Sequence, residues 1–408
     1  MGVELDFRSP AFRANPYPFY ERLRREEPVS RHEERGVRLW LLTRWADVAG
    51  VLRHPGASVD RPFQPRPTPL PPGVRVETLH PLARALRALS RVMLFRDPPD
   101  HTRLRGLVNK AFTPRVVERL RPRIDAVVEE LLDPCADDGG MDLISELATP
   151  LPILVIADLL GIPIEDYKEL KRWSDDLALM LDGSIAAQVA PRAVTSASEF
   201  VDYLRKVMAR RRAEPGDDLL SEMLAVQEKD DSLTEDEILG TSVLLLGAGH
   251  ETTTNLIGNG GLALLHHPSE LARLRREPQC LANAVEECLR FDSPVQATSR
   301  VLSEDVEIGG QRIPKGDEIG LLLGAANRDP AVFAKPDRFE VGREEARQHL
   351  SFGHGIHFCL GANLARAEGQ AAFAGLLRRF PGLRLAEDAL EWRPGFLFRG
   401  VERLALRF

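Results

Sequence analysis

A long helical segment is the feature that most constrains how this 408-residue chain folds. Thr234-Glu235-Asp236-Glu237 has the form of a capping box, which predicts that a helix begins there. The helical pattern continues to His266-His267-Pro268, and a helix of that length spans roughly 50 Å at about 1.5 Å per residue. Because only a helix that crosses a whole domain is this long, we expect the other elements to pack around it.

The centre of this predicted helix has an unusual composition. Gly247 and Gly249 each cost about 1 kcal/mol in a helix interior, so their presence calls for a reason. Ala248, Glu251 and Thr252 are spaced i, i+3 and i+4 and therefore share one face. Small residues there leave room for a flat cofactor and for oxygen, and an acid beside a hydroxyl is a candidate proton relay. The alternative is a kinked helix in which the threonine hydroxyl bonds back to a backbone carbonyl.

A second distinctive segment, 351–361, reads Ser-Phe-Gly-His-Gly-Ile-His-Phe-Cys-Leu-Gly and contains Cys359. Gly353 and Gly355 permit a tight, flat turn, and Gly361 lets the backbone approach a large planar ring. A run of good helix formers follows, so the cysteine would precede a helix N-terminus, where a thiolate is stabilised. We interpret the segment as a haem-binding loop with a thiolate ligand to iron. The alternative is a small buried core cysteine.

The spacing Phe-Gly-x-Gly-x-His-x-Cys-x-Gly resembles the haem-thiolate loop of the cytochrome P450 family. The Ala-Gly-x-Glu-Thr-Thr sequence of the long helix is similar to that family's oxygen-activation motif. The resemblance implies haem b as cofactor, with Cys359 as the iron ligand. It also implies that Glu251 and Thr252 are the acid–alcohol pair that delivers protons during oxygen activation. Further cofactor contacts implied by the resemblance are Ala248, Phe352, His357 and Gly361; His250 receives no catalytic role.

The segment Asp97 to Arg105 carries a third motif. His101 and Arg105 are four residues apart, so they share a helix face and would suit a pair of carboxylates such as haem propionates. The alternative is a solvated basic face. The resemblance favours propionate binding by these two residues, and it adds Arg300 and His357 as further propionate donors. We expect Asp100 to cap this helix, which would run to about Phe112, and Arg103 to lie on the surface.

Two short motifs in the C-terminal third concern structure rather than catalysis. Glu287 and Arg290 are three residues apart and would form an ordinary surface pair on a helix. The alternative is the buried Glu-x-x-Arg pair of the family, which joins an arginine from a Pro-x-Arg-Phe segment. Pro336-Asp337-Arg338-Phe339 matches that segment. The resemblance therefore gives Glu287, Arg290 and Arg338 a structural role in the core beside the haem.

Composition and cysteine usage bound the surroundings and partners of the chain. The net charge of -7 does not indicate a nucleic-acid partner, and cysteines 135, 280, 288 and 359 show no zinc-type spacing. The low cysteine content and the lack of a long apolar run near the N-terminus predict a cytoplasmic protein without a membrane anchor. No Gly-rich dinucleotide motif or ferredoxin cysteine pattern is present, so electrons would come from a separate ferredoxin or flavodoxin-type donor. Our docking hypothesis places an acidic ferredoxin near Arg103 and Arg366.

The predicted fold is mainly α-helical with a small β-rich region, as a single triangular-prism P450 domain over 1–408, expected as a monomer. Outside the long helix, we expect helices over 19–27, 44–53, 166–181, 193–212, about 279–291 and from 362, strands over 39–43 and 319–323, and a hairpin over 306–313 with Gly309-Gly310 as its turn. The proline-rich stretch 61–73 is interpreted as a long surface loop rather than a linker.

The predicted activity is a haem-thiolate monooxygenase that inserts one oxygen atom from O2 into a small molecule by hydroxylation or epoxidation. One alternative is a peroxide-driven peroxygenase, although such relatives usually lack the acid–alcohol pair. The other is a non-enzymatic haem sensor or carrier, which predicts an output domain that the sequence does not show. By family analogy the substrate pocket contains mostly apolar residues, which suit an apolar or amphipathic substrate: Met93, Leu94, Met180, Leu244, Val295, Gln296 and Phe396.

Overall fold

The computed structural model describes residues 6–7, 9–34, 37–60, 79–181, 186–230, 233–387 and 389–408. The proline-rich stretch 61–73 lies outside the described residues. The described chain divides into two compact units, each built from segments that are distant in sequence. Unit 1 comprises the described parts of 1–58, 120–151 and 252–408, and unit 2 comprises those of 59–119 and 152–251. The prediction of one domain over 1–408 remains a prediction.

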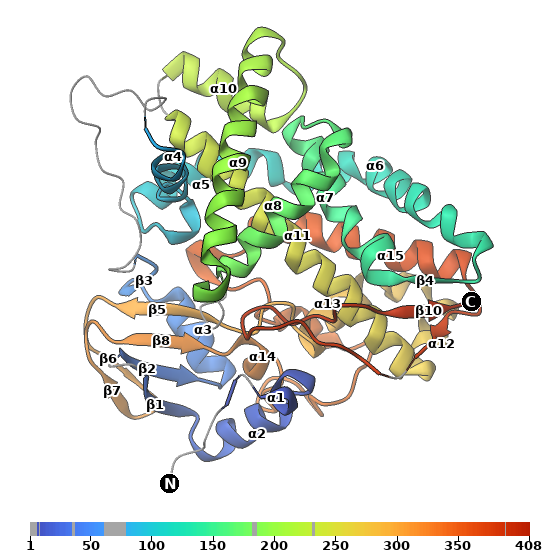
Figure 1. Cartoon of the computed structure of the whole chain (residues 1–408). Helices are drawn as coiled ribbons and strands as arrows, with labels where there is room; N and C mark the ends of the chain where they lie inside the picture. The colour runs from blue at the N-terminus through green and yellow to red at the C-terminus, as the bar shows by residue number, and fades with distance from the viewer. Residues whose placement is uncertain are drawn as a thin grey trace. The chain divides into compact units, whose positions relative to one another are not determined.

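Helix α11 (Glu235–His266) begins in unit 2 and ends in unit 1, and it is labelled near the centre of Figure 1. Its 32 residues span roughly 48 Å at about 1.5 Å per residue. The predicted capping box is present, because the Thr234 backbone N–H donates to Glu237 Oε2 at 2.9 Å and the Glu237 N–H donates to Thr234 Oγ1 at 3.3 Å. The start, end and length of this helix confirm the sequence prediction.

A five-stranded sheet forms the β-rich part of unit 1, with the order β1-β2-β8-β5-β3. The β2–β8 pair is parallel and the other neighbours are antiparallel. Buried apolar side chains of the sheet pack with those of α3 (Trp45–Arg53) into one core cluster. The predicted strands over 39–43 and 319–323 correspond to β2 and β8, each displaced by two residues or fewer. The strands are β1 (Val29–Glu34), β2 (Val37–Leu42), β3 (Ala57–Ser58), β5 (Thr298–Leu302) and β8 (Glu318–Leu321).

The predicted hairpin is present as β6 (Val306–Ile308) and β7 (Gln311–Ile313). Gly309 and Gly310 have φ angles of 59° and 76°, which is the pattern that a two-residue type I′ turn requires. A further sheet of unit 1 contains β4 (Gly140–Asp142), β10 (Ala405–Arg407) and β9 (Arg384–Leu385) in that order.

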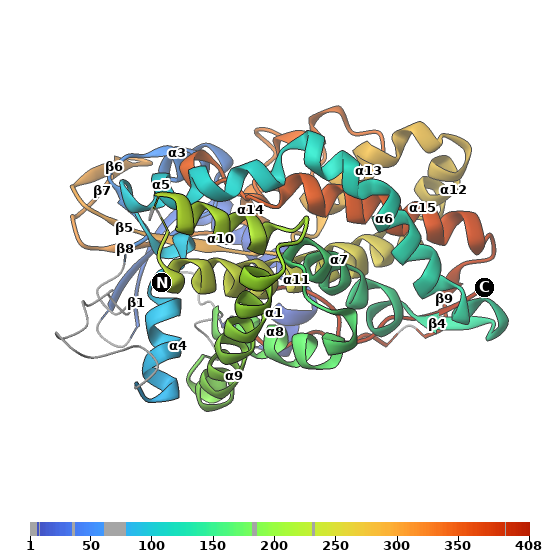
Figure 2. The same ribbon diagram turned by 90° about the horizontal axis from the view of Figure 1, so that it is seen from above.

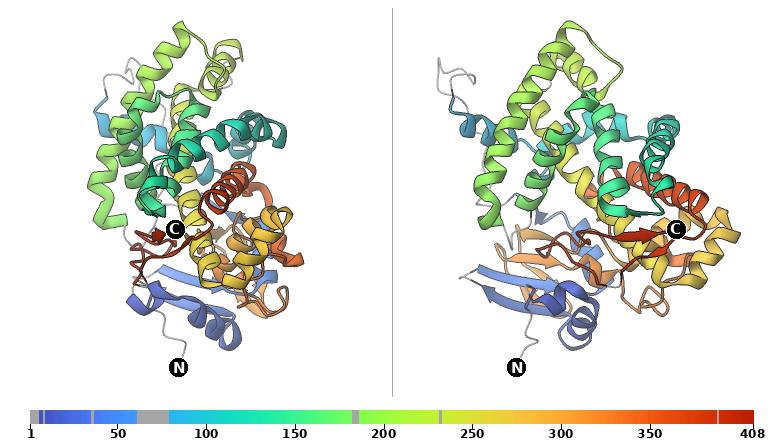
Figure 3. Two further views of the ribbon diagram at one scale, coloured as in Figure 1. Left: turned by 90° about the vertical axis from the view of Figure 1, so that its right-hand side faces the viewer. Right: turned by 45° about the vertical axis from the view of Figure 1, so that its right-hand side comes forward.

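The larger helices of unit 1 pack in pairs. Helix α13 (Leu281–Phe291) packs against α15 (Ala362–Arg379), and Figure 3 shows the two close together. The unit 1 part of α6 (Pro114–Leu132) runs alongside α15 (Figure 2). Arg379 of α15 pairs with Glu129 and Asp133, which lie on and just after α6. The remaining helices are α1 (Pro10–Ala14), α2 (Tyr17–Glu26), α12 (Pro268–Arg276) and α14 (Leu323–Ala326).

Unit 2 is helical in its described part. Helices α8 (Tyr167–Leu181) and α9 (Ala186–Ala213) pack side by side, with Trp173 stacked on Phe200 at 5.2 Å between ring centroids. The second of these starts at Ala186, earlier than the predicted 193–212, because the alanines before position 193 favour a helix over a connection. The others are α4 (Pro81–Leu89), α5 (Asp100–Val108), α7 (Pro150–Leu160, which begins in unit 1) and α10 (Leu219–Asp230).

The expected helix over 100–112 needs a correction at both ends. Pro99 is the N-cap residue and Asp100 is the first helical residue, so the predicted side-chain cap is wrong. The Asp100 carboxylate instead lies in the first turn of the helix, where its negative charge interacts favourably with the positive end of the helix dipole. The α-helix ends at Val108, and a 3₁₀ turn over Asn109–Phe112 replaces its predicted last turn.

Candidate functional site

The cysteine loop of unit 1, residues 351–361, is a tight turn held by its own backbone. The Cys359 N–H donates to the Phe352 carbonyl at 2.8 Å, which closes the loop. Gly353 and Gly355 have φ angles of 70° and 71°, so both take the conformation that glycine favours, as predicted. A Cβ on Gly355 would lie 2.5 Å from the Leu52 carbonyl oxygen at the end of α3, so the loop can approach α3 only with glycine there.

The outer face of this loop suits a flat apolar group with a metal centre. Cys359 is exposed, and the neighbouring side chains of Ile356 and Phe358 are 54% and 40% exposed. A Cβ added to Gly361 would meet no atom within 4 Å, so space is open at this point of the loop. Gly361 is also the N-cap of α15, whose N-terminus stabilises a thiolate. A soft sulfur ligand within an uncovered apolar surface fits haem iron and its ring.

A buried network supports the loop from within unit 1. Arg366 donates two hydrogen bonds to Glu286, at 2.6 and 3.0 Å, and its guanidinium lies 4.6 Å from the centre of the Phe352 ring. His349 Nε2 donates to Glu286 Oε2 at 3.0 Å, while His349 Nδ1 accepts from the Ser351 N–H at 3.1 Å. Because these contacts fix both sides of Phe352 and Ser351, they hold the first residues of the cysteine loop in place.

The charges of this network follow from its hydrogen bonds. Burial alone would raise the pKa of Glu286, but the bonds from His349 and Arg366 outweigh it and lower that pKa to about 2. Burial lowers the pKa of His349, which is therefore the neutral tautomer with its proton on Nε2. The positive partner of the carboxylate is thus Arg366. The docking hypothesis for Arg366 remains a prediction; the guanidinium is paired with Glu286 inside unit 1, and its side chain is 24% exposed.

A second buried cluster contains the predicted Glu-x-x-Arg pair. Arg290 is fully buried and donates to both Glu287 oxygens, at 2.7 and 2.8 Å. The second arginine is Arg343, whose Nε lies 3.1 Å from Glu287 Oε1. The prediction that the Arg338 side chain joins this buried cluster is wrong, because that side chain is exposed. Arg338 contributes only its backbone carbonyl, which accepts hydrogen bonds from Arg290 and Arg343. The match to the Pro-x-Arg-Phe pattern pointed to the correct segment but to the wrong arginine.

Neither Glu286 with His349 nor Arg343 was found from the sequence. Glu286 precedes the recognised Glu287, and His349 lies two residues before the cysteine loop, so both stand beside motifs. Glu286 and His349 are 63 residues apart in the sequence, and no local sequence pattern predicts that they pair.

The predicted propionate ligands are distributed over both units. His101 and Arg105 lie on α5 in unit 2, one turn apart, and His101 is buried. Burial and the nearby Arg105 charge lower the pKa of His101. Arg300 on β5 is buried in unit 1 and donates to the Ser299 carbonyl at 2.8 Å, and His357 is half-buried at the end of a 3₁₀ turn over Gly355–His357. That these four residues bind the propionates of one haem remains a prediction.

The predicted proton-delivery residues lie within α11, as expected. Glu251 is buried, and Ala248 and Thr252 are half-buried. One turn of helix separates Ala248 from Glu251 and Thr252, so the small residue and the two polar ones are on the same side. Their roles in oxygen activation remain predictions.

The predicted substrate-pocket residues occupy different surroundings. In unit 2, Met93 is buried, Leu94 is 37% exposed and Leu244 is half-buried, while the side chain of Met180 lies outside the described part of α8. In unit 1, Val295 packs against the core of the five-stranded sheet. A substrate-binding role of these residues remains a prediction.

Gln296 and Phe396 line one pocket of unit 1 together with Phe12 and Trp392. Gln296 is buried and uses its amide internally, because it accepts from the Tyr20 hydroxyl at 3.0 Å and donates to a backbone carbonyl at 2.7 Å. The Phe396 ring packs on Phe12 at 5.9 Å. These contacts explain both residues as packing elements, and their substrate-binding role also remains a prediction.

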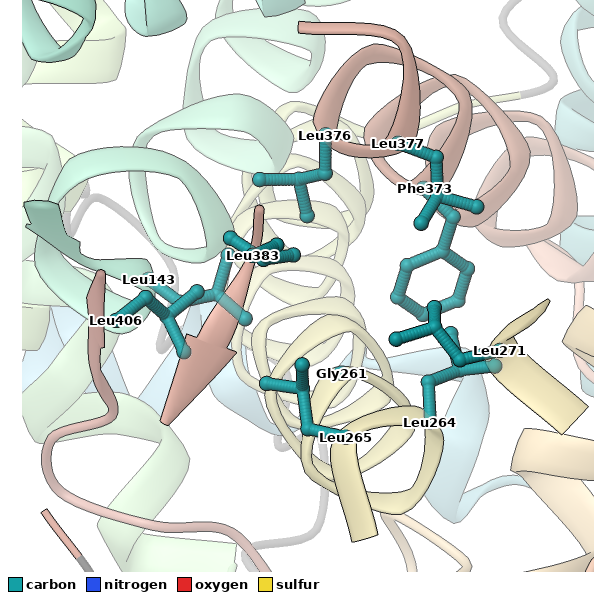
Figure 4. Close-up of a pocket in the computed structure, with 10 residues that line it drawn as sticks. All are labelled: Leu143, Gly261, Leu264, Leu265, Leu271, Phe373, Leu376, Leu377, Leu383 and Leu406. Carbon is teal, nitrogen blue, oxygen red and sulfur yellow. The ribbon is translucent and has the colours of Figure 1, made fainter. Parts of the chain in front are cut away.

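Another small pocket in unit 1 is a gap in the core rather than a binding site. Figure 4 shows that leucines from α11, α12, α15 and β10, and from positions next to β4 and β9, surround it, together with Phe373 and Gly261. All ten lining residues are apolar or glycine. Binding sites carry a few polar groups that orient a ligand, and this pocket has none among its side chains.

A buried carboxylic acid joins α15 to α11 within unit 1. Burial raises the pKa of Glu368 to about 8, opposed only by a hydrogen bond with Thr253. Because the folded state holds this proton more tightly than the unfolded state, stability is highest below the ordinary pKa of 4.5 and falls as the pH rises to about 8.

We expect Glu368→Gln to remove this pH dependence. Urea unfolding at pH 5 and pH 8.5 should show that the wild type loses roughly 3–4 kcal/mol more stability over this range than the variant, at about 1.4 kcal/mol per pKa unit. Glu344→Gln, at an exposed position, serves as the control and should behave as the wild type. Equal pH dependence in wild type and Glu368→Gln would contradict the assignment.

Comparison with known proteins identifies the class. Residues 80–388 match the family model of cytochrome P450. The chain is 41% identical over 408 residues to "Biotin biosynthesis cytochrome P450" of Bacillus subtilis, with all of both chains covered. It is 42% identical over 408 residues to 6-deoxyerythronolide B hydroxylase of Saccharopolyspora erythraea, with 98% of each chain covered. The crystal structure of P450BioI with an acyl carrier protein ligated to hexadec-9Z-enoic acid matches with a TM-score of 0.88 and 40% identity, over 98% of this chain and 100% of that one.

The chain therefore belongs to the cytochrome P450 family. Its fold is the P450 fold, so the predicted mainly helical class with a small β-rich region is confirmed. Named relatives are hydroxylases and monooxygenases, and the family binds haem, which the cysteine loop fits. Among the described residues, no helix combines the length and the apolar character needed to cross a membrane.

Proposed function

We propose that this cytochrome P450 inserts one oxygen atom from O2 into an apolar or amphipathic small molecule, by hydroxylation or epoxidation. The observation that carries the proposal is the exposed Cys359 thiol in a glycine-shaped loop at the start of α15, surrounded by exposed apolar side chains. Haem bound through this sulfur supplies the oxygen-activating chemistry. A ferredoxin with its reductase, or a flavodoxin-type protein, supplies the electrons in the cytoplasm.

The protein's part in this proposal is to hold the cofactor and to move protons. Cys359 would ligate the iron, and Phe352, Gly361 and Ala248 would contact the cofactor. Glu251 carries a buried carboxylate on α11 and gives protons toward the reacting oxygen, and Thr252 orients them. The propionates are held by the cationic and imidazole side chains His101, Arg105, Arg300 and His357.

The relatives support a biosynthetic substrate with a long apolar part. One relative is named for biotin biosynthesis, and another is named as a hydroxylase of 6-deoxyerythronolide B. A matching structure contains an acyl carrier protein that bears a fatty acid. We therefore place the substrate among long acyl chains and polyketides, either free or attached to a carrier protein.

The test supplies the haem-loaded protein with hexadec-9Z-enoic acid as the probe substrate. A substrate that enters the site should shift the spin state of the iron, which the absorption spectrum reports. A ferredoxin system should then give a product one oxygen atom heavier, measured by mass spectrometry. Product from hydrogen peroxide but not from the ferredoxin system would favour the peroxygenase alternative. Spectral change without product under either supply would favour a haem carrier.

We expect Thr252→Ala to uncouple oxygen use from product formation. Without the hydroxyl, proton delivery is misdirected and part of the O2 consumed is released as hydrogen peroxide. The ratio of peroxide to product should therefore rise about tenfold. The ratio of peroxide to product per O2 consumed measures this effect. Thr241→Ala alters a buried threonine nearer the start of the same helix and should leave the ratio unchanged. An unchanged ratio in Thr252→Ala would remove this residue from the proton path.

A further inference from the structure

A buried histidine lies beside the proposed proton-delivery acid, and its tautomer can be assigned. His250 on α11 is fully buried, and its Nδ1 lies 2.9 Å from the Ser174 Oγ on α8. The Ser174 hydroxyl donates its single hydrogen to the Leu246 carbonyl at 3.1 Å. In this arrangement Ser174 Oγ accepts from His250, which puts a proton on Nδ1; the opposite tautomer would require the hydroxyl to leave the Leu246 carbonyl. The second ring nitrogen, Nε2, is left as the one that gains and loses a proton.

Two carboxylates, those of Asp175 and Glu251, lie close to the His250 ring. His250 Nε2 lies 3.7 Å from Asp175 Oδ1, and one donor atom from each of Asp175, His250 and Glu251 falls within 4.8 Å of the others. The Asp175 side chain is 35% exposed, whereas His250 and Glu251 are buried. The three groups therefore form a series of steps between solvent and the buried Glu251 carboxylate.

The charges around Asp175 favour protons over a metal ion. Lys171 Nζ lies 2.6 Å from Asp175 Oδ2, so an ammonium already neutralises this carboxylate. Tyr167 stays protonated, because burial and the Asp175 charge raise its pKa to about 12. The neighbouring Asp176 turns to α9, where it pairs with Arg192 at 2.5 Å. A divalent cation would have to displace the lysine, whereas a proton need not.

We infer that His250 is a positioning residue that reloads Glu251 with protons taken up at Asp175. The inference rests on the proposed role of Glu251. Once Glu251 has given up its proton, the imidazolium of His250 transfers the Nε2 proton to the carboxylate and becomes neutral. Nε2 then takes a proton from a water at Asp175, which solvent reprotonates, and the Nδ1 proton stays on His250, hydrogen-bonded to Ser174 Oγ, throughout. Each reloading step takes up one proton from solvent and passes one to Glu251, and no electron moves.

The distances suit transfer through water. Proton transfer needs a direct hydrogen bond of about 2.6–3.2 Å or one bridging water. The 3.7 Å between Nε2 and Asp175 is slightly longer than a direct bond, so a small side-chain rotation or one water closes it. His250 stands at the variable position of the Ala-Gly-x-Glu-Thr-Thr motif, and its partners Ser174 and Asp175 lie on another helix, so no local pattern indicates a role for it.

The first arm of the test observes the imidazole itself. Nitrogen-15 NMR of histidine-labelled, haem-loaded protein in the carbon monoxide form, with His250→Gln identifying the signal, should show Nδ1 protonated throughout a pH titration. Asp175→Asn should move the Nε2 titration to lower pH, because the carboxylate that favours the imidazolium is gone. His266→Gln changes an exposed histidine at the end of α11 and should leave the signal unchanged. A proton that titrates on Nδ1, or no shift in Asp175→Asn, would overturn the inference.

The second arm measures turnover with hexadec-9Z-enoic acid and a ferredoxin system. His250→Gln should lower product formation about tenfold or more, raise the solvent deuterium isotope effect, and remove the fall in rate that accompanies loss of the imidazolium at high pH. The reduced carbon monoxide spectrum should stay that of the wild type. A rate, isotope effect and pH profile equal to those of His266→Gln would overturn the inference.

The two arms separate this inference from the proposed function. A wild type without thiolate ligation would defeat the proposed function and the inference that rests on it. A wild type with the thiolate spectrum but no oxidation of the fatty acid would defeat the substrate assignment, and the NMR arm would then decide the role of His250. Normal wild-type turnover with unaffected His250→Gln would defeat the inference alone.

Discussion

Cys359→Ser should abolish the strongly red-shifted Soret band of the reduced protein in carbon monoxide, and with it all monooxygenase activity. The band depends on electron donation from an anionic sulfur, and a serine hydroxyl does not ionise to replace it. The loop backbone should survive, because its closing bond runs from the residue 359 N–H to the Phe352 carbonyl and does not involve the side chain. The loss should therefore be spectroscopic and catalytic rather than structural.

The control for this experiment is Cys280→Ser, which changes a half-buried cysteine of unit 1 outside the loop. It should retain the red-shifted band and the activity. Far-UV circular dichroism should show that both variants keep the helical content of the wild type. A red-shifted band that persists in Cys359→Ser, or disappears in Cys280→Ser, would contradict the ligand assignment.

Arg290→Met should produce the largest loss of stability among single substitutions outside the loop. The variant leaves Glu287 buried and lacking its two bonds from residue 290, which costs about 3–5 kcal/mol for a broken buried ion pair. It also removes donors from the carbonyls of Asn327 and Pro336. We expect little folded, haem-loaded protein, measured as the ratio of haem to protein absorbance after purification.

Two milder variants keep this prediction informative if Arg290→Met does not fold. Arg343→Lys keeps a charge near Glu287 but loses the planar guanidinium that reaches three backbone carbonyls, so its melting temperature should fall by several degrees. Arg338→Ala removes an exposed side chain and should change stability by about 0.5 kcal/mol or less. The opposite order would restore the original assignment of Arg338.

Features with a local cause were predictable from the sequence. The capping box at Thr234 fixed the start of α11, and two consecutive glycines fixed the hairpin turn at Gly309-Gly310, because one stretch of chain contains all the interacting atoms. The cysteine loop was recognised for the same reason. Its glycines take the φ angles that their spacing indicated.

The remaining features depend on pairs that are distant along the chain. Arg343 reaches Glu287 across 56 positions, and His349 reaches Glu286 across 63. An arginine or a histidine near a motif has the same local pattern whether it faces solvent or a buried carboxylate. The error for Arg338 has this cause, since burial is decided by other helices and strands.

The course of α11 has a consequence for anyone who wishes to divide this protein into fragments. Each unit is assembled from separated stretches of sequence, and the helix that starts in one ends in the other. A fragment spanning 59–251 would contain all of unit 2, but it would also carry 120–151, whose partners would be missing. It would also cut the helix between Glu251 and Thr252. Expression as two separate polypeptides, or insertion of a tag within Glu235–His266, should therefore fail where a tag at an exposed turn such as Gly309-Gly310 succeeds.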